Sequence, residues 1–244
     1  MGNSISGSVS DGVLTKQPYL VKNVTAGVMD MRETKQQESM LNSFSATALT
    51  CIRNDVVLFK DLGFRLNGGE VLQIQGPNGS GKTSLLRILC GLAQPDTGAI
   101  LWNEKNIHDH RQDYLNEMSY VGHVNGIKME LTALENMTIA GALSVTDKNI
   151  FSLEALDKMG LAEYDNTPAR KLSSGQRRRL ALARLLITDA RLWILDEPLT
   201  SLDNYGRQMM RDMISAHAAD NGITVLATHD PVDIQHHKIT MINL

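Results

Sequence analysis

Residues 76–83 read GPNGSGKT, and they fit the phosphate-loop pattern GxxxxGK[ST] at every required position. Residues 70–75 before them alternate between apolar and polar side chains, as a strand does. Residues 84–90 after them carry apolar side chains at helical spacing, and Gly91 stands where a helix cap is expected. A strand, a glycine-rich loop and a helix in this order predict a site for the phosphates of a nucleotide.

The residue types of this loop suit such a ligand. Its glycines let the backbone approach a polyphosphate and turn its N–H groups inward, while the following helix points its positive end at the same anion. Lys82 would reach the β- and γ-phosphates, and the Thr83 hydroxyl would ligate Mg²⁺. A chance match in a glycine-rich turn is the alternative, which the flanking strand and helix disfavour. The candidate residues for binding ATP are therefore Gly76, Pro77, Asn78, Gly79, Ser80, Gly81, Lys82, Thr83 and Ser84.

Composition limits the class of protein. The chain has 244 residues, a length that is enough for one ordinary domain or two small ones. Its net charge is −3. It has no basic block of the kind that binds nucleic acid and no apolar run of about 18 residues that would span a membrane. Cys51 and Cys90 lie far apart and outside any CxxC pattern, so we expect both to be reduced core residues. These features predict a soluble cytosolic protein.

The first 39 residues differ from the rest of the chain. They are rich in Ser, Gly, Asn, Lys and Gln, and they lack a sustained hydrophobic period. Met1, Gly2 and Ser6 fit the loose pattern for myristoylation, which we attribute to chance. We therefore expect residues 1–39 to be a poorly ordered extension and residues 40–244 to be the folded domain, with Met40 as a candidate natural start.

A second apolar segment would complete the site. Residues 192–198 read LWILDEP, a strand that ends in two carboxylates. Asp196 is placed to hold Mg²⁺ directly or through water, and Glu197 is placed to polarise the water that attacks the γ-phosphate. Two surface charges at a sheet edge are the alternative, which the buried apolar run disfavours.

Two further motifs are informative because they accompany GPNGSGKT and LWILDEP. Residues 222–230 read GITVLATHD, a strand after which His229 would contact the γ-phosphate and the attacking water. Residues 172–176 read LSSGQ and precede an arginine-rich helix. The N-terminus of this helix is another potential anion site. Taken alone, however, the LSSGQ motif indicates an ordinary helix cap followed by solvated arginines.

Taken in order, these motifs together with SLD at residues 201–203 resemble those of ABC-type ATPases across about residues 44–244. The resemblance implies an α/β fold. Its parts would be a RecA-like phosphate-loop core, an antiparallel β subdomain, and a helical signature subdomain at about residues 125–185. It also implies a homodimer of ATPase domains that closes around two ATP molecules.

The resemblance assigns a role to each matching residue. Lys82, Thr83, Asp196, Glu197 and His229 would act on the ATP of their own chain. Ser173 and Gly175 would touch the γ-phosphate of the ATP held by the partner chain, and Asp203 would lie at the seam between the two chains.

Three positions depart from the usual pattern of the family. Ser174 replaces a signature glycine, and because serine is small we expect function to survive. Arg53 stands where an aromatic residue usually stacks on adenine, and a guanidinium can also stack on a purine. His123 stands where a glutamine usually senses Mg²⁺ and the attacking water, and it would serve as a neutral ligand or donor.

The chain closely resembles the CcmA family of cytochrome c maturation ATPases in four stretches, residues 51–59, 65–102, 114–123 and 122–136. This resemblance implies a peripheral position on the cytoplasmic face of the bacterial inner membrane, and a membrane subunit CcmB as partner. With CcmC and CcmD, the complex would use ATP hydrolysis to free the haem-loaded chaperone CcmE, which older descriptions call haem export. The alternatives are the ATPase of another small exporter of lipid, peptide or drug, a non-catalytic regulatory cassette, and a nucleic-acid ATPase, which the absence of insertions disfavours.

Overall fold

The computed structural model describes residues 42–143, 152–229, 231–234 and 237–244. The predicted extension at residues 1–39 lies outside the described residues. Both cysteines are described, and both are buried and free, as the sequence predicts.

Four strands form an antiparallel sheet in the spatial order β2-β1-β4-β5. They are β1 (Ser43–Arg53), β2 (Val56–Asn67), β4 (Thr97–Trp102) and β5 (Lys105–Asn106). Asn54 and Asp55 join β1 to β2 with positive φ angles of 50° and 61°, as a type I′ hairpin turn requires.

Five strands form a parallel sheet in the spatial order β6-β7-β8-β3-β9. They are β3 (Val71–Gln75), β6 (Met118–Val121), β7 (Leu192–Asp196), β8 (Ile223–Ala227) and β9 (Ile239–Asn243). Every residue of β7 and β8 is buried, which is the pattern of central strands covered on both faces. Because the strands are parallel, the loops that follow β3, β7 and β8 all emerge at one edge of the sheet.

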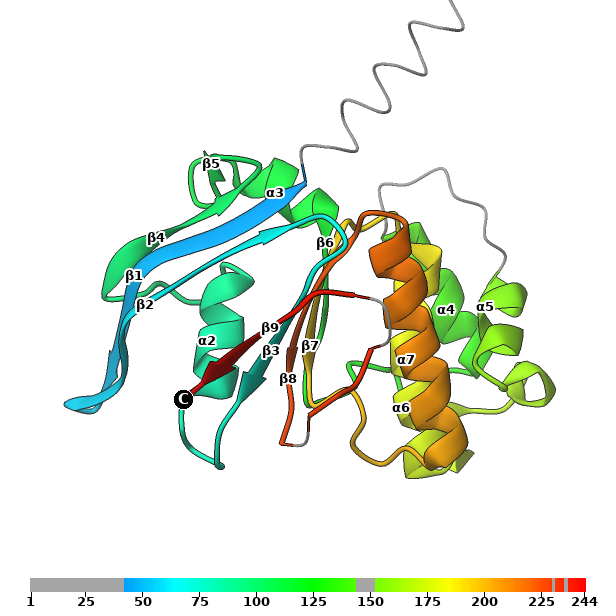
Figure 1. Ribbon diagram of the computed structural model, residues 1–244. Coiled ribbons are helices and arrows are strands. Elements are labelled where there is room, and N and C mark those ends of the chain that lie inside the picture. The colour runs from blue at the N-terminus through cyan, green and yellow to red at the C-terminus, as the bar shows by residue number, and fades with distance from the viewer. Residues whose placement is uncertain (1–41, 144–151, 230, 235–236) are drawn as a thin grey trace, which may run out of the picture. The chain divides into compact units, whose positions relative to one another are not determined.

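Helices cover both faces of this sheet. Figure 1 shows α2 (Lys82–Leu89) between the two sheets. On the far side of the parallel sheet lie α4 (Ala133–Ala142), α5 (Ser152–Lys158), α6 (Ser174–Ala183) and α7 (Asn204–Ala219). The first core consequently joins Phe44 of β1, Leu85 of α2 and Ile194 of β7, all fully buried. Burying one such side chain stabilises the fold by about 1.5–3 kcal/mol. This core fixes α2, and with it the phosphate loop, against the parallel sheet.

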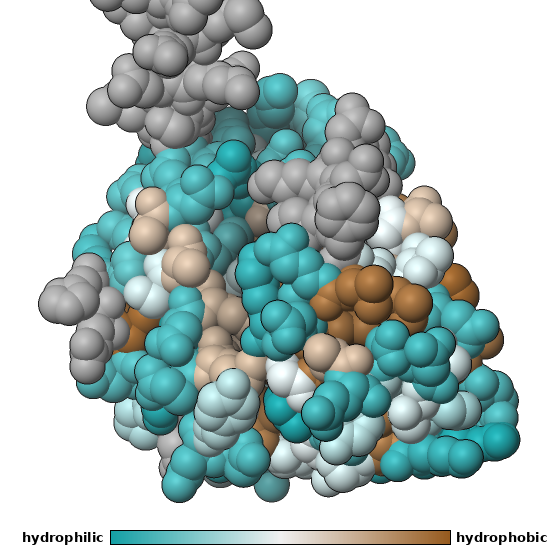
Figure 2. Space-filling view, turned by 90° about the vertical axis from the view of Figure 1, so that its right-hand side faces the viewer, coloured by the Kyte–Doolittle hydropathy of each residue, from teal (hydrophilic) through white to brown (hydrophobic). Residues whose placement is uncertain are grey.

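The second core lies among α4, α5, α6 and α7, with short 3-10 turns at Ala162–Tyr164, Ala169–Lys171 and Arg184–Ile187. Helix α3 (Arg111–Glu117) instead contributes Tyr114 to the first core. The face that carries α4, α5 and α7 shows apolar areas within a mostly polar surface (Figure 2). Exposed large apolar side chains on α4 and α5 and just after α4 are Ile139, Leu143 and Leu153. Helices α3 and α7 and strand β9 are elements that the motif-based prediction did not include.

Candidate nucleotide-binding site

The phosphate loop, residues 76–81, joins the end of β3 to the start of α2. Lys82 Nζ donates hydrogen bonds to the carbonyl oxygens of Gly76 (2.6 Å) and Pro77 (3.0 Å), so the loop wraps around the lysine. Gly81 caps α2 with a φ of 108°, and a Cβ at this position would lie 3.2 Å from Leu58 Cβ. A glycine is therefore needed where the loop turns into the helix.

Two oxygen ligands for a hard cation meet beside this loop. Thr83 Oγ1 donates a hydrogen bond of 3.1 Å to Asp196 Oδ2. Asp196 closes β7 and is only 2% exposed. Mg²⁺ prefers a hydroxyl, one or two carboxylates and substrate phosphates, so the chemistry of this pair fits the predicted ion.

Glu197 follows Asp196 and holds an unusual backbone conformation. Its φ is 49°, which costs a non-glycine residue free energy and occurs mainly where the surroundings hold it in place. Its N–H donates to the Ala227 carbonyl of β8 at 3.0 Å. The Oε1 atom then lies 3.2 Å from His229 Nε2, with side chains that are 14% exposed for Glu197 and 48% for His229.

These groups share one cavity. It has a volume of about 250 Å³, and its lining joins the phosphate loop to the ends of β7 and β8. His123 also lines it, although the loop that carries His123 follows the edge strand β6. The predicted site residues in this lining are Asn78, Gly79, Gly81, Lys82, Thr83, Ser84, His123, Asp196, Glu197 and His229.

The structure does not bring the remaining predicted residues into that cavity. Ser173 caps α6, where its Oγ accepts from the Gln176 N–H at 3.1 Å, and Asp203 caps α7, where Oδ1 accepts from the Gly206 N–H at 2.8 Å. A Cβ on Gly175 would lie 2.8 Å from the Ser201 carbonyl oxygen, so the LSSGQ and SLD segments are packed together. Within one chain they form a second surface, at the N-termini of α6 and α7.

Arg53 contacts neighbouring residues of its own chain. Its Nη1 lies 3.5 Å from Asp96 Oδ2 and donates to the Ile52 carbonyl at 2.7 Å. Contact between Arg53 and adenine stays a prediction.

The alternative interpretation, in which the arginines after LSSGQ are solvated, does not hold for Arg178, which is 4% exposed. Its guanidinium points into the end of β7 and the loop after β6. A periodic signal was present: Arg178 shares a stripe at helical spacing with the buried residues Ala181, Leu182 and Leu185.

Gln73 is a second residue that the motifs did not identify. It lies in the middle of β3 and is 1% exposed. Its Oε1 accepts from the Val232 N–H at 3.0 Å, and its Nε2 donates to the Val232 carbonyl. This pair anchors the segment that follows His229 to the strand that precedes the phosphate loop. In the sequence Gln73 is one of the polar positions of an alternating strand, so nothing there marked it as buried.

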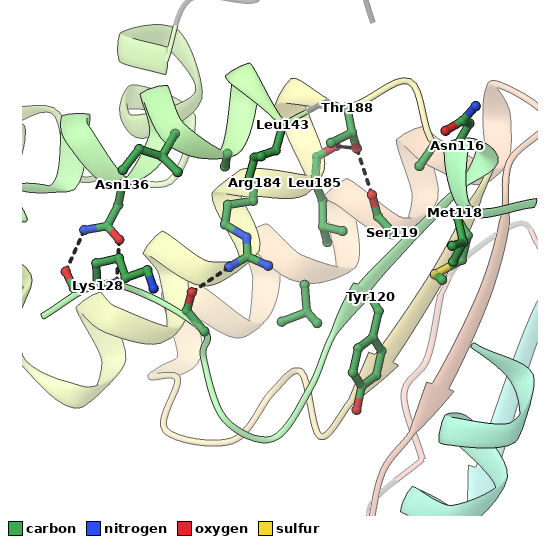
Figure 3. Close-up of a pocket in the computed structure, with 16 residues that line it drawn as sticks. Asn116, Met118, Ser119, Tyr120, Lys128, Asn136, Leu143, Arg184, Leu185 and Thr188 are labelled. Carbon is green, nitrogen blue, oxygen red and sulfur yellow. Dashed lines mark hydrogen bonds between the residues drawn. The ribbon is translucent and has the colours of Figure 1, made fainter. Parts of the chain in front are cut away.

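A groove of about 380 Å³ lies on the far side of the His123 loop, between β6, α4 and the turn at Arg184–Ile187 (Figure 3). Asn136 of α4 accepts from the Lys128 N–H at 2.7 Å and donates to the Lys128 carbonyl at 2.9 Å. Arg184 Nη1 donates to the Gly126 carbonyl at 3.1 Å. The groove and the nucleotide cavity are therefore linked by one loop, residues 122–128.

The fold and this site define an ATP-binding domain of the ABC class. The sequence profile of the ABC transporter family matches residues 59–200. Two solved structures have a TM-score of 0.70 to the chain: an ATP-binding subunit of an ABC transporter (21% identical, covering 76% of this chain and 79% of that one) and a putative ABC transporter ATP-binding protein from Pyrococcus furiosus (20% identical, covering 83% and 97%). At these identities the structures support the fold alone.

Curated relatives are much more similar. A cytochrome c biogenesis ATP-binding export protein CcmA from Nitrosospira multiformis is 46% identical over 197 residues, which is 80% of this chain and 96% of that protein. The protein of the same name from Escherichia coli (strain K12) is 43% identical over 204 residues, 84% of this chain and 97% of that protein. The chain therefore belongs to the ABC transporter family, as an ATP-hydrolysing transporter subunit that is similar to CcmA over most of its length. Among the described residues, none of the helices has the length and apolar character needed to cross a membrane.

Proposed function

We propose that the chain is the ATP-hydrolysing subunit of a membrane complex for c-type cytochrome biogenesis. The observation that carries this proposal is the 43–47% identity to proteins named CcmA across 78–84% of the chain. The partners would be the membrane subunit CcmB with CcmC and CcmD, and the product of the cycle would be release of the haem-loaded chaperone CcmE. The chain would bind peripherally at the cytoplasmic face of the inner membrane.

Six residues of the cavity lining have a proposed task. Lys82 would neutralise the β- and γ-phosphates, while Thr83 and Asp196 would hold Mg²⁺, which supplies positive charge to the phosphate oxygens. Glu197 would accept the proton of the water that attacks the γ-phosphorus as the bond to the β–γ bridging oxygen breaks. His229, at 3.2 Å from Glu197 and half-exposed, would orient that water and the γ-phosphate. His123, which also lines the cavity, would sense the same atoms.

A second copy of the chain would complete the site. Ser173, Gly175 and Asp203 lie outside the cavity lining, yet Ser173 and Asp203 cap helix N-termini that favour anions. We infer that this surface covers the γ-phosphate bound to a partner chain, so that hydrolysis waits for dimer closure. Helices at about residues 125–185 would move as the signature subdomain, and residues 1–39 would form an extension without a part in the chemistry.

The groove of Figure 3 supports the inferred contact with the membrane subunit. It is hollow, half-apolar in its lining, and bounded by Ile139 and Leu143, which expose 42% and 79% of their area. A cytoplasmic segment of CcmB that fills it would press on residues 126–128, the same loop that carries His123. The proposal thereby connects the membrane partner to the nucleotide.

Affinity isolation tests this assignment. A tagged Glu197→Gln chain, which would hold ATP and stay assembled, is isolated from detergent-solubilised membranes of the cells that make it, and its partners are identified by mass spectrometry. We expect CcmB, CcmC and CcmD in the complex. Recovery of the membrane subunit of a lipid, peptide or drug exporter in their place would contradict the assignment and leave the ATPase chemistry intact.

A further inference from the structure

One buried guanidinium joins three parts of the site. Arg178 lies in α6, the helix that LSSGQ begins, and it is 4% exposed. Its Nη1 donates to the Gly122 carbonyl (2.8 Å) and to Asn125 Oδ1 (3.0 Å), so it holds the loop that carries His123. Arg184, which lines the groove, holds the same loop at the Gly126 carbonyl.

The other three donors reach the end of β7. Nη2 donates to the carbonyls of Asp196 (2.7 Å) and Glu197 (2.8 Å), and Nε donates to the Pro198 carbonyl at 3.4 Å. A guanidinium has five N–H donors, and each of them has one acceptor here. The carbonyls belong to three consecutive residues, which include the left-handed Glu197.

Burying the charged guanidinium of Arg178 costs free energy. Burial lowers the pKa of Arg178, and the nearby carboxylates of Asp196 and Glu197 act in the opposite direction. A buried cation is tolerated when it is fully hydrogen-bonded. The next residue of α6 differs: among the described residues, Arg179 donates to the carbonyls of Met159 and Gly160, and it lies partly exposed.

We propose that Arg178 is a positioning residue. It fixes the backbone from which the Glu197 side chain projects, and it ties this backbone to the loop that carries His123. A movement of α6 would therefore displace the Glu197 carboxylate. The proposal rests on the proposed role of Glu197 in hydrolysis. Arg178 does not touch the substrate. It holds the carbonyls of Asp196 and Glu197, which flank the Cα from which the Glu197 side chain projects. A misplacement of about 1 Å costs on the order of 100-fold in rate.

The test separates turnover from binding. Arg178→Lys keeps the charge but concentrates its donors on one nitrogen, so it cannot span Gly122 and Glu197 together. We expect kcat for phosphate release to fall by about 10- to 100-fold, while the affinity for ATP, measured by equilibrium binding without turnover, changes by less than about threefold. Arg179→Lys is the matched control on the same helix, and it should leave both quantities unchanged.

A second variant covers the case in which Arg178→Lys does not fold. Asn125→Ala removes one acceptor on the loop side and leaves the bonds to β7, so a fall in kcat of about two- to fivefold is expected with binding unchanged. Wild-type turnover in Arg178→Lys, an equal loss of turnover and ATP binding in it, or wild-type turnover in Asn125→Ala where the lysine variant is unfolded would each overturn the proposal. Glu197→Gln is measured in parallel: if it still hydrolyses ATP, the proposed role of Glu197 fails, whereas an inactive Glu197→Gln with a normal Arg178→Lys refutes only the role of Arg178.

Discussion

Glu197 Oε1 lies 3.2 Å from His229 Nε2, although the two residues follow different strands of the parallel sheet. The carboxylate is mostly buried and the imidazole is half-exposed. Strands β7 and β8 are neighbours in register, with Asp196 opposite Ala227, and this register brings the two side chains together. The pair therefore places a mostly buried carboxylate next to an imidazole that lines the same cavity.

Replacement of the carboxylate tests the base directly. Glu197→Gln keeps the shape of the side chain but cannot accept the proton, so we expect phosphate release to fall at least about 100-fold while ATP still binds. Glu104→Gln is the control, because Glu104 lies in an exposed surface ion pair with Arg65 and should not affect turnover. Unchanged hydrolysis in Glu197→Gln would show that another group activates the water.

The hydroxyl of Thr83 is expected to be a ligand of Mg²⁺. Thr83→Ala removes an oxygen that lies 3.1 Å from Asp196 Oδ2, and it should shift the Mg²⁺ concentration for half-maximal activity upward by about tenfold or more. Thr83→Ser retains the hydroxyl and should behave like the wild type. Equal Mg²⁺ titration curves for the alanine and serine variants would remove Thr83 from the ion.

Two helix caps of the same design allow a controlled test of the signature serine. Ser173 and Gln176 form a capping box on α6, and Thr132 and Glu135 form the equivalent box on α4. Ser173→Ala and Thr132→Ala should each lower the free energy of unfolding by about 1 kcal/mol. Only Ser173→Ala should also abolish most of the ATPase activity. Equal effects of the two variants on turnover would assign Ser173 to helix stability alone.

Mixing inactive chains tests the proposed homodimer. If Ser173 acts on the ATP of a partner chain, a heterodimer of Ser173→Ala with Glu197→Gln has one site in which every group is intact. An equal mixture should then regain up to about a quarter of wild-type phosphate release, because half of the dimers are mixed and each has one working site. A mixture as inactive as its components would show that Ser173 and Glu197 act within the same chain.

A buried histidine predicts a pH dependence of stability. His217 in α7 stacks on Trp193 with ring centroids 3.8 Å apart and an angle of 3° between the planes. Burial is the main cause that lowers its pKa from 6.5 to about 4. Below pH 6.5 the unfolded chain takes up a proton that the folded chain refuses until about pH 4, so stability is lost as the pH falls through this window.

Urea unfolding at two pH values measures this effect. We expect the free energy of unfolding to be lower at pH 5 than at pH 7 by about 2 kcal/mol from His217 alone. His217→Phe keeps an aromatic ring on Trp193 but does not titrate, so its loss over the same range should be smaller by that amount. Parallel pH curves for both proteins would show that His217 is protonated in the folded state.

Much of the site could be predicted from the sequence because the candidate site residues stand at the ends of apolar strands. Strand β7 ends at Asp196, and His229 follows two residues after the end of β8. Parallel strands present such ends at one edge of the sheet. Helix α7 was less visible. Its buried residues Gly206, Met210, Ile214 and Ala218 recur every four positions, but two of them are small and give a weak apolar stripe. Strand β9 depends on its register with β3, to which its own sequence gives no clue.

The supporting residues of the site needed the structure. Arg178 contacts residues that are distant in the sequence, and so does Gln73, so local spacing cannot name their partners. Arg178 shows the general difficulty: in a run of three arginines, the one that faces the core is set by helix phase, and what it binds there is set by the ends of other strands. Sequence motifs identify groups that meet the ligand more readily than groups that hold those groups in place.

We propose above that ATP hydrolysis, with Glu197 as its base, serves cytochrome c biogenesis. The most direct measurement is a haem stain of membranes from cells whose only copy of the protein carries Glu197→Gln, beside cells that carry Glu104→Gln. We expect covalently bound haem to disappear from c-type cytochromes and to accumulate on the small membrane chaperone CcmE in the first strain only. Normal haem staining of c-type cytochromes in the Glu197→Gln strain would contradict it.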